Sequence, residues 1–361
     1  MYRQILVHKA DQEFQRILWK EKPELPVGEY QLTAVTYGLT SAPYLAIGVL
    51  RELVQDEGEH FPLASHVILE NTYVDDILLG AEDVDQGREK INELNQLLKI
   101  AIHLNLDQSP FFRALGLAWR TDINGFAFSP QAHQTQDNLP KRKVLLQNAQ
   151  LFDPLGWLSP ITIRAKISMQ ELWALGLDWA EPLSASLSSR WIDFLQDLHG
   201  ISAITIPRWI GSSSASLGIE IHGFADASQN ALSAVIYARK YIDTHEVRVS
   251  LVCAKTKVAP LKKVTIPRLE LCAAYLVVRL MCHVEKTSNL EHTPVHLWTD
   301  STVTLAWIKN HPSQWEEFVR SRITEIQEFA RARWYHISGS ENLADLASRG
   351  AFPEQLQNSE L

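Results

Sequence analysis

The sequence predicts a multidomain protein that combines α/β and α+β architecture, and three observations lead to this fold class. The chain has 361 residues, which is longer than one ordinary domain. Its 46% hydrophobic and 21% charged residues are typical of a folded globular protein. Helical and strand patterns follow one another differently in three stretches. We therefore predict domains at 1–115, 116–216 and 217–361.

The composition also indicates a compartment. Apolar runs fall far short of the ~20 residues that a membrane span needs, and the N-terminus has no apolar signal segment. The three cysteines (Cys253, Cys272 and Cys282) cannot form a disulfide framework and lack the paired spacing of a zinc site. We expect an intracellular protein of the cytoplasm or nucleus that is neither secreted nor bound to a membrane.

In the first domain, a Gly/Pro-marked turn at 37–43 precedes a predicted helix at 44–55, and a second helix is predicted at 84–100. Between them, the apolar segment 67–80 is interrupted by Asp75 and Asp76. A tight hairpin would present both carboxylates at its tip, where they could hold Mg²⁺ and a triphosphate. The alternative is an exposed turn that happens to carry two acids.

The middle domain is rich in tryptophan and helical in pattern. Helices are predicted at 141–152, 161–175 and 188–198, and the small residues at 211–216 predict a linker. Lys141, Arg142 and Lys143 could contact a nucleic-acid backbone, although a solvated helix start explains them equally well.

The third domain has the predicted order β-β-β-α-β-α-α-β-α, which indicates an α/β fold with antiparallel and then parallel pairing. Strands are predicted at 219–225, 231–239, 247–254, 295–298 and 334–337. Helices are predicted at 267–282, 300–308, 316–331 and 341–348.

Four acids in this domain fall at strand ends or helix starts, where sites form in α/β sheets: Asp226, Glu270, Asp300 and Asp345. If they converge, they cannot all stay ionised without a cation. Two divalent ions could neutralise them, and carboxylate oxygens favour Mg²⁺ or Mn²⁺ over zinc. Taken singly, Asp300 could be a helix cap, Asp226 a turn residue, and the other two solvated helix residues.

The net charge of −8 gives no support for nucleic-acid binding, but the local charge does. Eight basic residues lie between Arg239 and Arg268 against two acidic ones. A local basic stretch can neutralise phosphates even on an acidic protein. We predict phosphate contacts at Lys255, Lys257, Lys262, Lys263 and Arg268. These side chains could instead simply solvate strand faces and a loop.

Four motifs of the third domain occur together in one known family. They are Phe-Ala-Asp-Ala-Ser at 224–228, Pro-Arg-Leu-Glu-Leu at 267–271, Thr-Asp-Ser at 299–301 and Asn-Leu-Ala-Asp-Leu-Ala-Ser-Arg-Gly at 342–350. This set resembles the ribonuclease H domain of retroelement Pol polyproteins, more narrowly that of BEL/Pao long-terminal-repeat retrotransposons. The resemblance implies that Asp226, Glu270, Asp300 and Asp345 bind the metal of an enzyme that hydrolyses RNA in RNA–DNA hybrids. His336 and His311 are weaker candidates for proton shuttles, and His336 is better explained as structural.

The first domain resembles a reverse transcriptase palm. Tyr-Val-Asp-Asp at 73–76 resembles the catalytic hairpin, and Tyr-Gly-Leu-Thr-Ser-Ala-Pro-Tyr at 37–44 resembles the template and nucleotide motif before it. In that family a further catalytic aspartate precedes the segment that Met1-Tyr2 resembles. We therefore expect 1–115 to be a truncated palm, inactive by itself.

The middle domain is similar to a BEL/Pao segment that is often labelled an aspartic peptidase. Phe-Asp-Pro-Leu-Gly-Trp-Leu-Ser-Pro at 152–160 carries much of this similarity, but neither Asp-Thr-Gly nor Asp-Ser-Gly occurs. Asp153 is more simply a turn residue, and the segment is better explained as a helical connector. Three functions remain open: a Pol fragment with ribonuclease H activity, an inactive nucleic-acid-binding fragment, and a Pao-type peptidase. The expected partners are an RNA–DNA hybrid or another nucleic acid, and other Pol segments.

Overall fold

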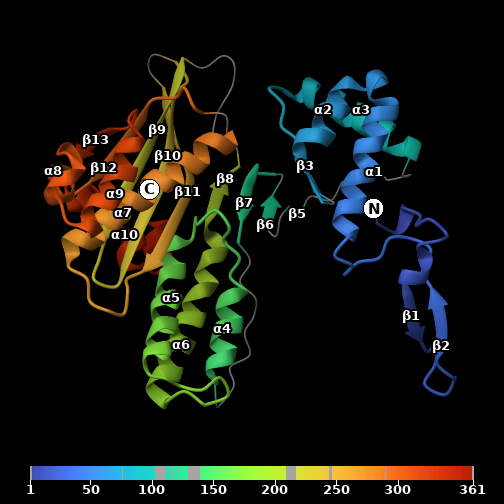
Figure 1. Ribbon diagram of the computed structural model, residues 1–361, viewed down its shortest axis with the longest axis horizontal. Coiled ribbons are helices and arrows are strands. Elements are labelled where there is room, and N and C mark those ends of the chain that lie inside the picture. Colours follow the sequence, from blue (N-terminus) through green and yellow to red (C-terminus); the bar gives the residue numbers. More distant parts are fainter. Residues whose placement is uncertain are drawn as a thin grey trace. The chain divides into compact units, whose positions relative to one another are not determined.

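The computed structural model describes residues 2–74, 76–101, 111–114, 117–120, 122–128, 139–208, 217–243, 246–288 and 290–359. The chain separates into two compact units, Met1–Pro110 and Phe111–Leu361, which we name unit 1 and unit 2 (Figure 1). The mixture of helices and sheets agrees with the predicted fold class.

Unit 1 is built on three helices: α1 (Ala42–Glu57), α2 (Pro62–Asn71) and α3 (Val84–Ala101). Proline stands in the first turn of α1 and of α2, where its missing N–H costs nothing. Apolar residues three and four positions apart form their shared core, as with Leu94, Leu97 and Leu98 on α3. Two hairpins complete the unit, β1 (Arg16–Trp19) with β2 (Gly28–Gln31) and β3 (Thr72–Tyr73) with β4 (Asp76–Ile77).

The hairpin around the paired aspartates is shorter than the apolar segment 67–80 suggested. Val67 and Ile68 lie in α2, because with Ala64 they have the three- and four-residue spacing that buries one helix face. Only two residues pair on each side, with Thr72 opposite Ile77 and Tyr73 opposite Asp76.

Unit 2 contains two sheets and eight helices among the described residues. The small sheet has the order β5-β6-β7-β8 and the large one β11-β10-β9-β12-β13. The strands are β5 (Phe111–Ala114), β6 (Leu117–Arg120), β7 (Gly125–Ala127), β8 (Thr205–Pro207), β9 (Gly218–Ala227), β10 (Ala231–Tyr241), β11 (Val247–Val258), β12 (Val295–Thr299) and β13 (Arg333–His336). The helices are α4 (Lys141–Ala149), α5 (Ser159–Ala174), α6 (Ala185–Asp197), α7 (Ile266–Ser288), α8 (Thr302–Lys309), α9 (Glu317–Glu328), α10 (Asp345–Arg349) and α11 (Pro353–Gln357).

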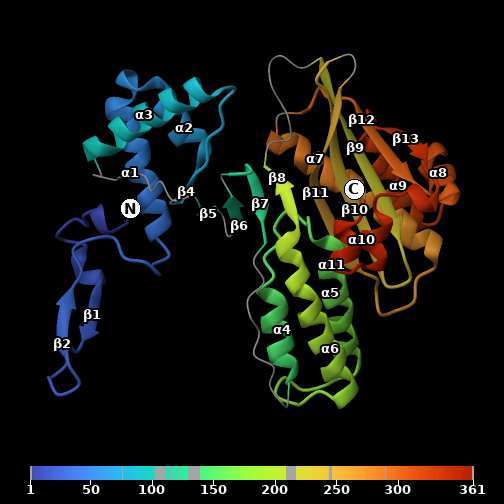
Figure 2. The same cartoon turned by 180° about the vertical axis from the view of Figure 1, so that it is seen from behind.

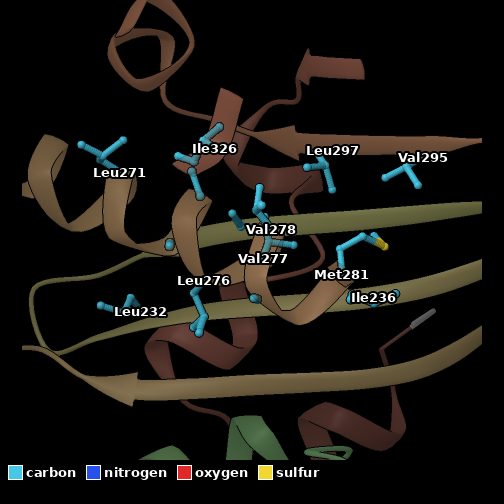
Figure 3. Packing of buried hydrophobic residues seen from close by; sticks show 14 of the residues in the cluster. Leu232, Ile236, Leu271, Leu276, Val277, Val278, Met281, Val295, Leu297 and Ile326 are labelled. Carbon is cyan, nitrogen blue, oxygen red and sulfur yellow. The ribbon is translucent and has the colours of Figure 1, made fainter. Parts of the chain in front are cut away.

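The large sheet joins an antiparallel half to a parallel half at β9. β9 pairs antiparallel with β10 and parallel with β12, and β13 continues the parallel side. Side chains alternate between the faces, so Ile221 and Ala225 join the core under α7, whereas Phe224 packs with α10 on the opposite face. Figure 3 shows α7 lying across the sheet, with Val277 and Met281 directed at the strands.

The helices α4, α5 and α6 belong to unit 2 because a short segment before α5 docks on the edge strand β11. The Ala254 amide donates to the Leu155 carbonyl (2.8 Å), and the Trp157 indole donates to the Val252 carbonyl (2.9 Å). Gly156 has φ +74°, and a Cβ there would lie 1.9 Å from the Ala254 oxygen. Figure 2 shows that α5 begins beside α10 and near β11.

The predicted elements of the third domain are present with shifted ends. The third strand, β11, runs on to Val258, and the last helix, α10, begins at Asp345 rather than at 341 because a 3₁₀ turn (Gly339–Glu341) precedes it. The predicted linker at 211–216 lies outside the described residues. No helix in the described part of the chain is both long and apolar enough to span a membrane. Cys253, Cys272 and Cys282 are free thiols.

Candidate active site

The four predicted acids come from four elements that end or begin at one edge of the large sheet. Asp226 lies near the end of β9, and Asp300 directly follows β12. The two strands are parallel, with Ala225 opposite Thr299, so these two aspartates are neighbours at the carboxyl edge. Glu270 stands in the first turns of α7, and Asp345 is the first residue of α10.

Two of the four carboxylates, Asp226 and Glu270, have raised pKa values. Burial raises the pKa of Asp226 to about 6, and the charges of Asp300 and Asp345 add to the increase. Burial also raises the pKa of Glu270, again with a contribution from Asp300. The structure therefore brings Asp226 beside Asp300 and Asp345, and Glu270 beside Asp300, whereas a shared metal-binding role for the four acids stays a prediction.

Hydrogen bonds from α10 and the turn before it hold Asp226 in place. The Ser348 hydroxyl donates to the Asp226 carboxylate and lowers its pKa, which partly offsets burial. Ser348 is fully buried. The Asn342 amide donates to the Ala225 carbonyl (3.0 Å), and the Ser233 hydroxyl donates to the Ala344 carbonyl (2.8 Å). These bonds tie α10 to β9 and β10 beside the site.

Arg349 places a positive charge beside two of the acids, Asp345 and Asp226. Its Nε donates to Asp345 Oδ1 at 2.6 Å, and its guanidinium lowers the pKa of Asp226. Sequence reasoning missed Ser348 and Arg349 as members of the site, although both lie in the motif at 342–350. Their spacing of three and four residues from Asp345 was a usable signal, because such residues share a helix face.

The donor set suits a hard divalent cation. The Asp300 Oδ1 atom is buried and has no hydrogen-bond partner among the described residues, so its lone pairs are available to a ligand. Carboxylate oxygens are the ligands that Mg²⁺ and Mn²⁺ prefer. A Cβ at Gly339 would lie 3.2 Å from Asp300 Oδ2, so the chain passes close to this carboxylate. The residues therefore fit the predicted metal.

The predicted phosphate-binding residues divide into two groups. Lys255, Lys257, Lys262 and Lys263 are exposed. Lys255 and Lys257 flank Thr256 on β11. Thr256 is paired with Ser233 on β10, and Ser233 is paired with Asp226 on β9. The two lysines therefore lie two strands from Asp226, about 10 Å across the sheet. Arg268 is instead paired with Glu316 at 3.3 Å and lies over the Phe318 ring.

The two candidate proton shuttles differ in position. His336 ends β13 opposite Thr299, is exposed, and lies on the strand next to the one that leads to Asp300. His311 is exposed and contacts the Ser313 hydroxyl at 2.8 Å. Neither position tests the shuttle prediction.

Asp153 has the surroundings of a structural turn residue. Its Oδ2 accepts a hydrogen bond from the Leu158 amide at 2.9 Å, where α5 begins. Burial raises its pKa, while the amides of Leu158, Trp157 and Gly156 and the charge of Lys166 oppose the increase. No second carboxyl of the described residues is among these influences, whereas an aspartic peptidase needs two that share a proton.

In unit 1, Asp76 is half-buried on β4 opposite Tyr73, and Asp75 lies outside the described residues. Val74 has φ +59°, a left-handed conformation that a β-branched residue adopts rarely. The predicted tight hairpin is therefore present, whereas the pairing of both carboxylates on a metal is untested.

Comparison with known families identifies one region. Residues 140–301 match the profile of a family described as Pao retrotransposon-like RNaseH-like domain. This stretch includes the helices α4 to α6, the strands β9 to β12 and three of the four acids. No curated protein matches the chain.

Three solved structures share the fold. A foamy viral protease-reverse transcriptase dRH in complex with double-stranded DNA has a TM-score of 0.59 at 12% identity, covering 92% of this chain and 54% of that one. The foamy viral enzyme with an RNA/DNA hybrid scores 0.56 at 12% identity (96% and 43% covered). Its complex with double-stranded DNA scores 0.55 at 13% identity (92% and 64% covered). The chain thus spans about half the length of the structures it matches.

Proposed function

We propose that this chain is a retroelement Pol fragment whose unit 2 hydrolyses the RNA strand of RNA–DNA hybrids. The observation that carries the proposal is the placement of Asp226, Glu270, Asp300 and Asp345 at one sheet edge, where burial and the neighbouring charges raise the pKa values of Asp226 and Glu270. The match of residues 140–301 to a Pao retrotransposon-like RNaseH-like domain supports the same assignment.

In this proposal each acid has a binding role. Asp226, Glu270 and Asp300 would hold divalent cations, Mg²⁺ or Mn²⁺, and Asp345 would complete the set. When bound, the cations would supply the positive charge that activates water and stabilises the departing oxygen of a phosphodiester. The Ser348 hydroxyl orients Asp226 and favours its charged form, and Arg349 holds Asp345. Ser348 and Arg349 would therefore fix the carboxylates of Asp226 and Asp345 in position for a cation.

The substrate follows from the basic surface and from the relatives. Exposed Lys255 and Lys257 lie on the edge strand β11 at the level of Asp226 but project from the opposite face of the sheet, so they could contact phosphates where a duplex passes the strand edge. One of the similar foamy viral structures holds an RNA/DNA hybrid. Recognition would depend on backbone shape and 2′-hydroxyls rather than on base sequence.

The experiment is a cleavage assay on a hybrid with a labelled RNA strand, in Mg²⁺ or Mn²⁺, with single-stranded RNA and duplex DNA as further substrates. The parent chain should cut only the hybrid RNA, and Asp226→Asn and Asp300→Asn should not. Asp193→Asn, an exposed acid on α6, is the matched control and should cut normally. Hybrid binding without cleavage by the parent chain would support a non-catalytic nucleic-acid-binding role instead.

For unit 1 we propose a remnant of a polymerase palm, supported by the hairpin that carries Asp76 and by the foamy viral reverse transcriptase fold. Primer extension on an RNA template is the test, and we expect none from this chain. Other Pol segments are proposed partners, and a cytoplasmic or nuclear location is proposed with them.

A further inference from the structure

A second cluster of metal-binding side chains lies on the large sheet, away from the four acids. Glu220 and His222 belong to β9, and His296 belongs to β12. The two histidines are register partners on parallel strands, and Glu220 lies two positions before His222. All three therefore project from one face of the sheet.

The distances within this cluster are those of a site that could close on one ion. Glu220 Oε2 lies 3.4 Å from His222 Nε2, and Glu220 Oε1 lies 3.9 Å from His296 Nε2. The three ligand atoms all fall within 4.8 Å of one another. Ligands around tetrahedral zinc are roughly 3.3–3.5 Å apart, given zinc–ligand bonds of about 2.0–2.1 Å. Movements of the three side chains by about an ångström would bring their ligand atoms to the separations of a tetrahedral zinc site.

Neighbouring hydroxyls orient two of the ligands. The Tyr241 hydroxyl donates to Glu220 Oε2 at 3.1 Å. His296 Nδ1 lies 3.3 Å from the Tyr335 hydroxyl, so the ring can donate there and leave Nε2 free. Metal-bound histidines usually have such a partner on the second nitrogen. The side chains of His222, His296 and Glu220 are 14%, 16% and 26% exposed, so an ion can enter from solvent.

We propose that Glu220, His222 and His296 bind one divalent transition-metal ion of the zinc class. Two imidazoles and one carboxylate suit zinc better than magnesium, and they leave a fourth position for water. His222 and His296 precede Asp226 and Asp300 by four residues on the same strands. The ion would lie about 13 Å from the acids and would link β9 to β12. This site is independent of the proposed hybrid cleavage.

One contact gives the proposal a specific consequence. The Trp298 indole donates to His222 Nδ1 at 3.2 Å, so without metal the ring proton lies on Nε2 and faces Glu220. A metal on Nε2 moves that proton to Nδ1 and costs the Trp298 hydrogen bond. Removing the indole donor should therefore favour the metal-bound state. Arg239, 3.6 Å from Glu220 and partly exposed, is the charge that the ion would displace.

The test uses Co²⁺ as a spectroscopic probe for zinc, with the full chain stripped of metal. Tetrahedral Co²⁺ absorbs strongly in the visible region, whereas Co²⁺ on the all-carboxylate site is six-coordinate and absorbs weakly. The parent chain should develop the strong absorption up to one equivalent, and Zn²⁺ should remove it. Asp226→Asn with Asp300→Asn should leave this signal unchanged.

Variants of the three ligands complete the test, each checked for an unchanged circular dichroism spectrum without metal. His222→Ala and His296→Ala should lose the absorption, and Glu220→Gln should weaken binding at least tenfold. His199→Ala, an exposed histidine on the turn after α6, should bind like the parent. Trp298→Phe, which keeps an aromatic ring, should bind as tightly as the parent or more tightly.

Three results would overturn the proposal. The first is no tetrahedral absorption from the folded parent chain. The second is an unchanged titration in folded His222→Ala or His296→Ala. The third is a tenfold loss of affinity in Trp298→Phe, which would be inconsistent with ligation through His222 Nε2.

Discussion

The two aspartate-bearing regions of this protein differ in how they are supported. In unit 2, Asp226 lies near the end of a strand of ten residues at the centre of a five-stranded sheet, with α7 on one face and α10 on the other. In unit 1, Asp76 lies on a strand of two residues that pairs only with another of two. The first region places four carboxylates at one edge of a large sheet.

This contrast shows which parts of the fold support buried acids. Burial raises the pKa values of Asp226 and Glu270, and the charge of Asp300 adds to both increases. Long strands and the hydrogen bond from buried Ser348 to Asp226 support them despite this. The hairpin of unit 1 has no comparable framework among the described residues.

The largest expected effect distinguishes the two regions directly. Asp300→Asn removes a carboxylate whose buried Oδ1 is free for a ligand, and should reduce hybrid cleavage about 1,000-fold. Asp76→Asn should leave the cleavage rate within twofold of the parent. Initial rates on a labelled hybrid measure both. Equal losses of hybrid cleavage in the two variants would contradict the proposed difference between unit 1 and unit 2.

The next effect tests the support behind the site. Gly156→Ala places a Cβ against the Ala254 carbonyl in a left-handed conformation, and should destabilise unit 2 by about 3 kcal/mol. Gly176→Ala is the matched control, because Gly176 has φ +68° with nothing within 4 Å. It should cost about 1–2 kcal/mol. Urea unfolding followed by tryptophan fluorescence reports on unit 2, which holds ten of the eleven tryptophans.

A smaller effect concerns stability without metal. The pKa of Asp226 is raised to about 6, so the folded state holds this proton more tightly than the unfolded state does. Stability therefore falls as pH rises from about 4 to about 6, and the cost persists above that range. Asp226→Asn should stabilise the metal-free protein by about 1–3 kcal/mol at pH 7 and by almost nothing at pH 4. Unfolding in a chelator at both pH values tests this, and destabilisation at pH 7 would contradict it.

The smallest effect concerns Ser348 as a positioning residue. Ser348→Ala removes the hydroxyl that favours the charged form of Asp226, so the pKa of Asp226 should rise further. Cleavage at pH 7 should fall about tenfold, and the acid limb of the pH–rate profile should move to higher pH. An unmoved profile would mean that Ser348 acts only in packing.

Much of the large sheet could be predicted from local patterns. The apolar run before Asp226 and the serine cap after Asp300 both indicate element ends, and the four motifs together predict one site. The hairpin of unit 1 was predicted less well, because Val67 and Ile68 are β-branched yet belong to a helix. Their spacing from Ala64 outweighs their preference for strands.

Contacts that depend on register could not be predicted in the same way. The pairing of His222 with His296 joins strands 74 positions apart, and the docking of Gly156 on Ala254 joins segments 98 positions apart. One signal was present for the histidines, since each precedes a predicted site aspartate by four residues. If Asp226 and Asp300 meet at one edge of a parallel pair, those histidines must be neighbours as well.

The most direct test of the central claim is crystallography of the full chain soaked in Mn²⁺, with anomalous diffraction to locate the ions. We predict anomalous density between Asp226, Glu270 and Asp300, lost in Asp300→Asn. A parent crystal that cleaves hybrid when dissolved, yet holds no Mn²⁺ at these carboxylates at saturating concentration, would contradict the account.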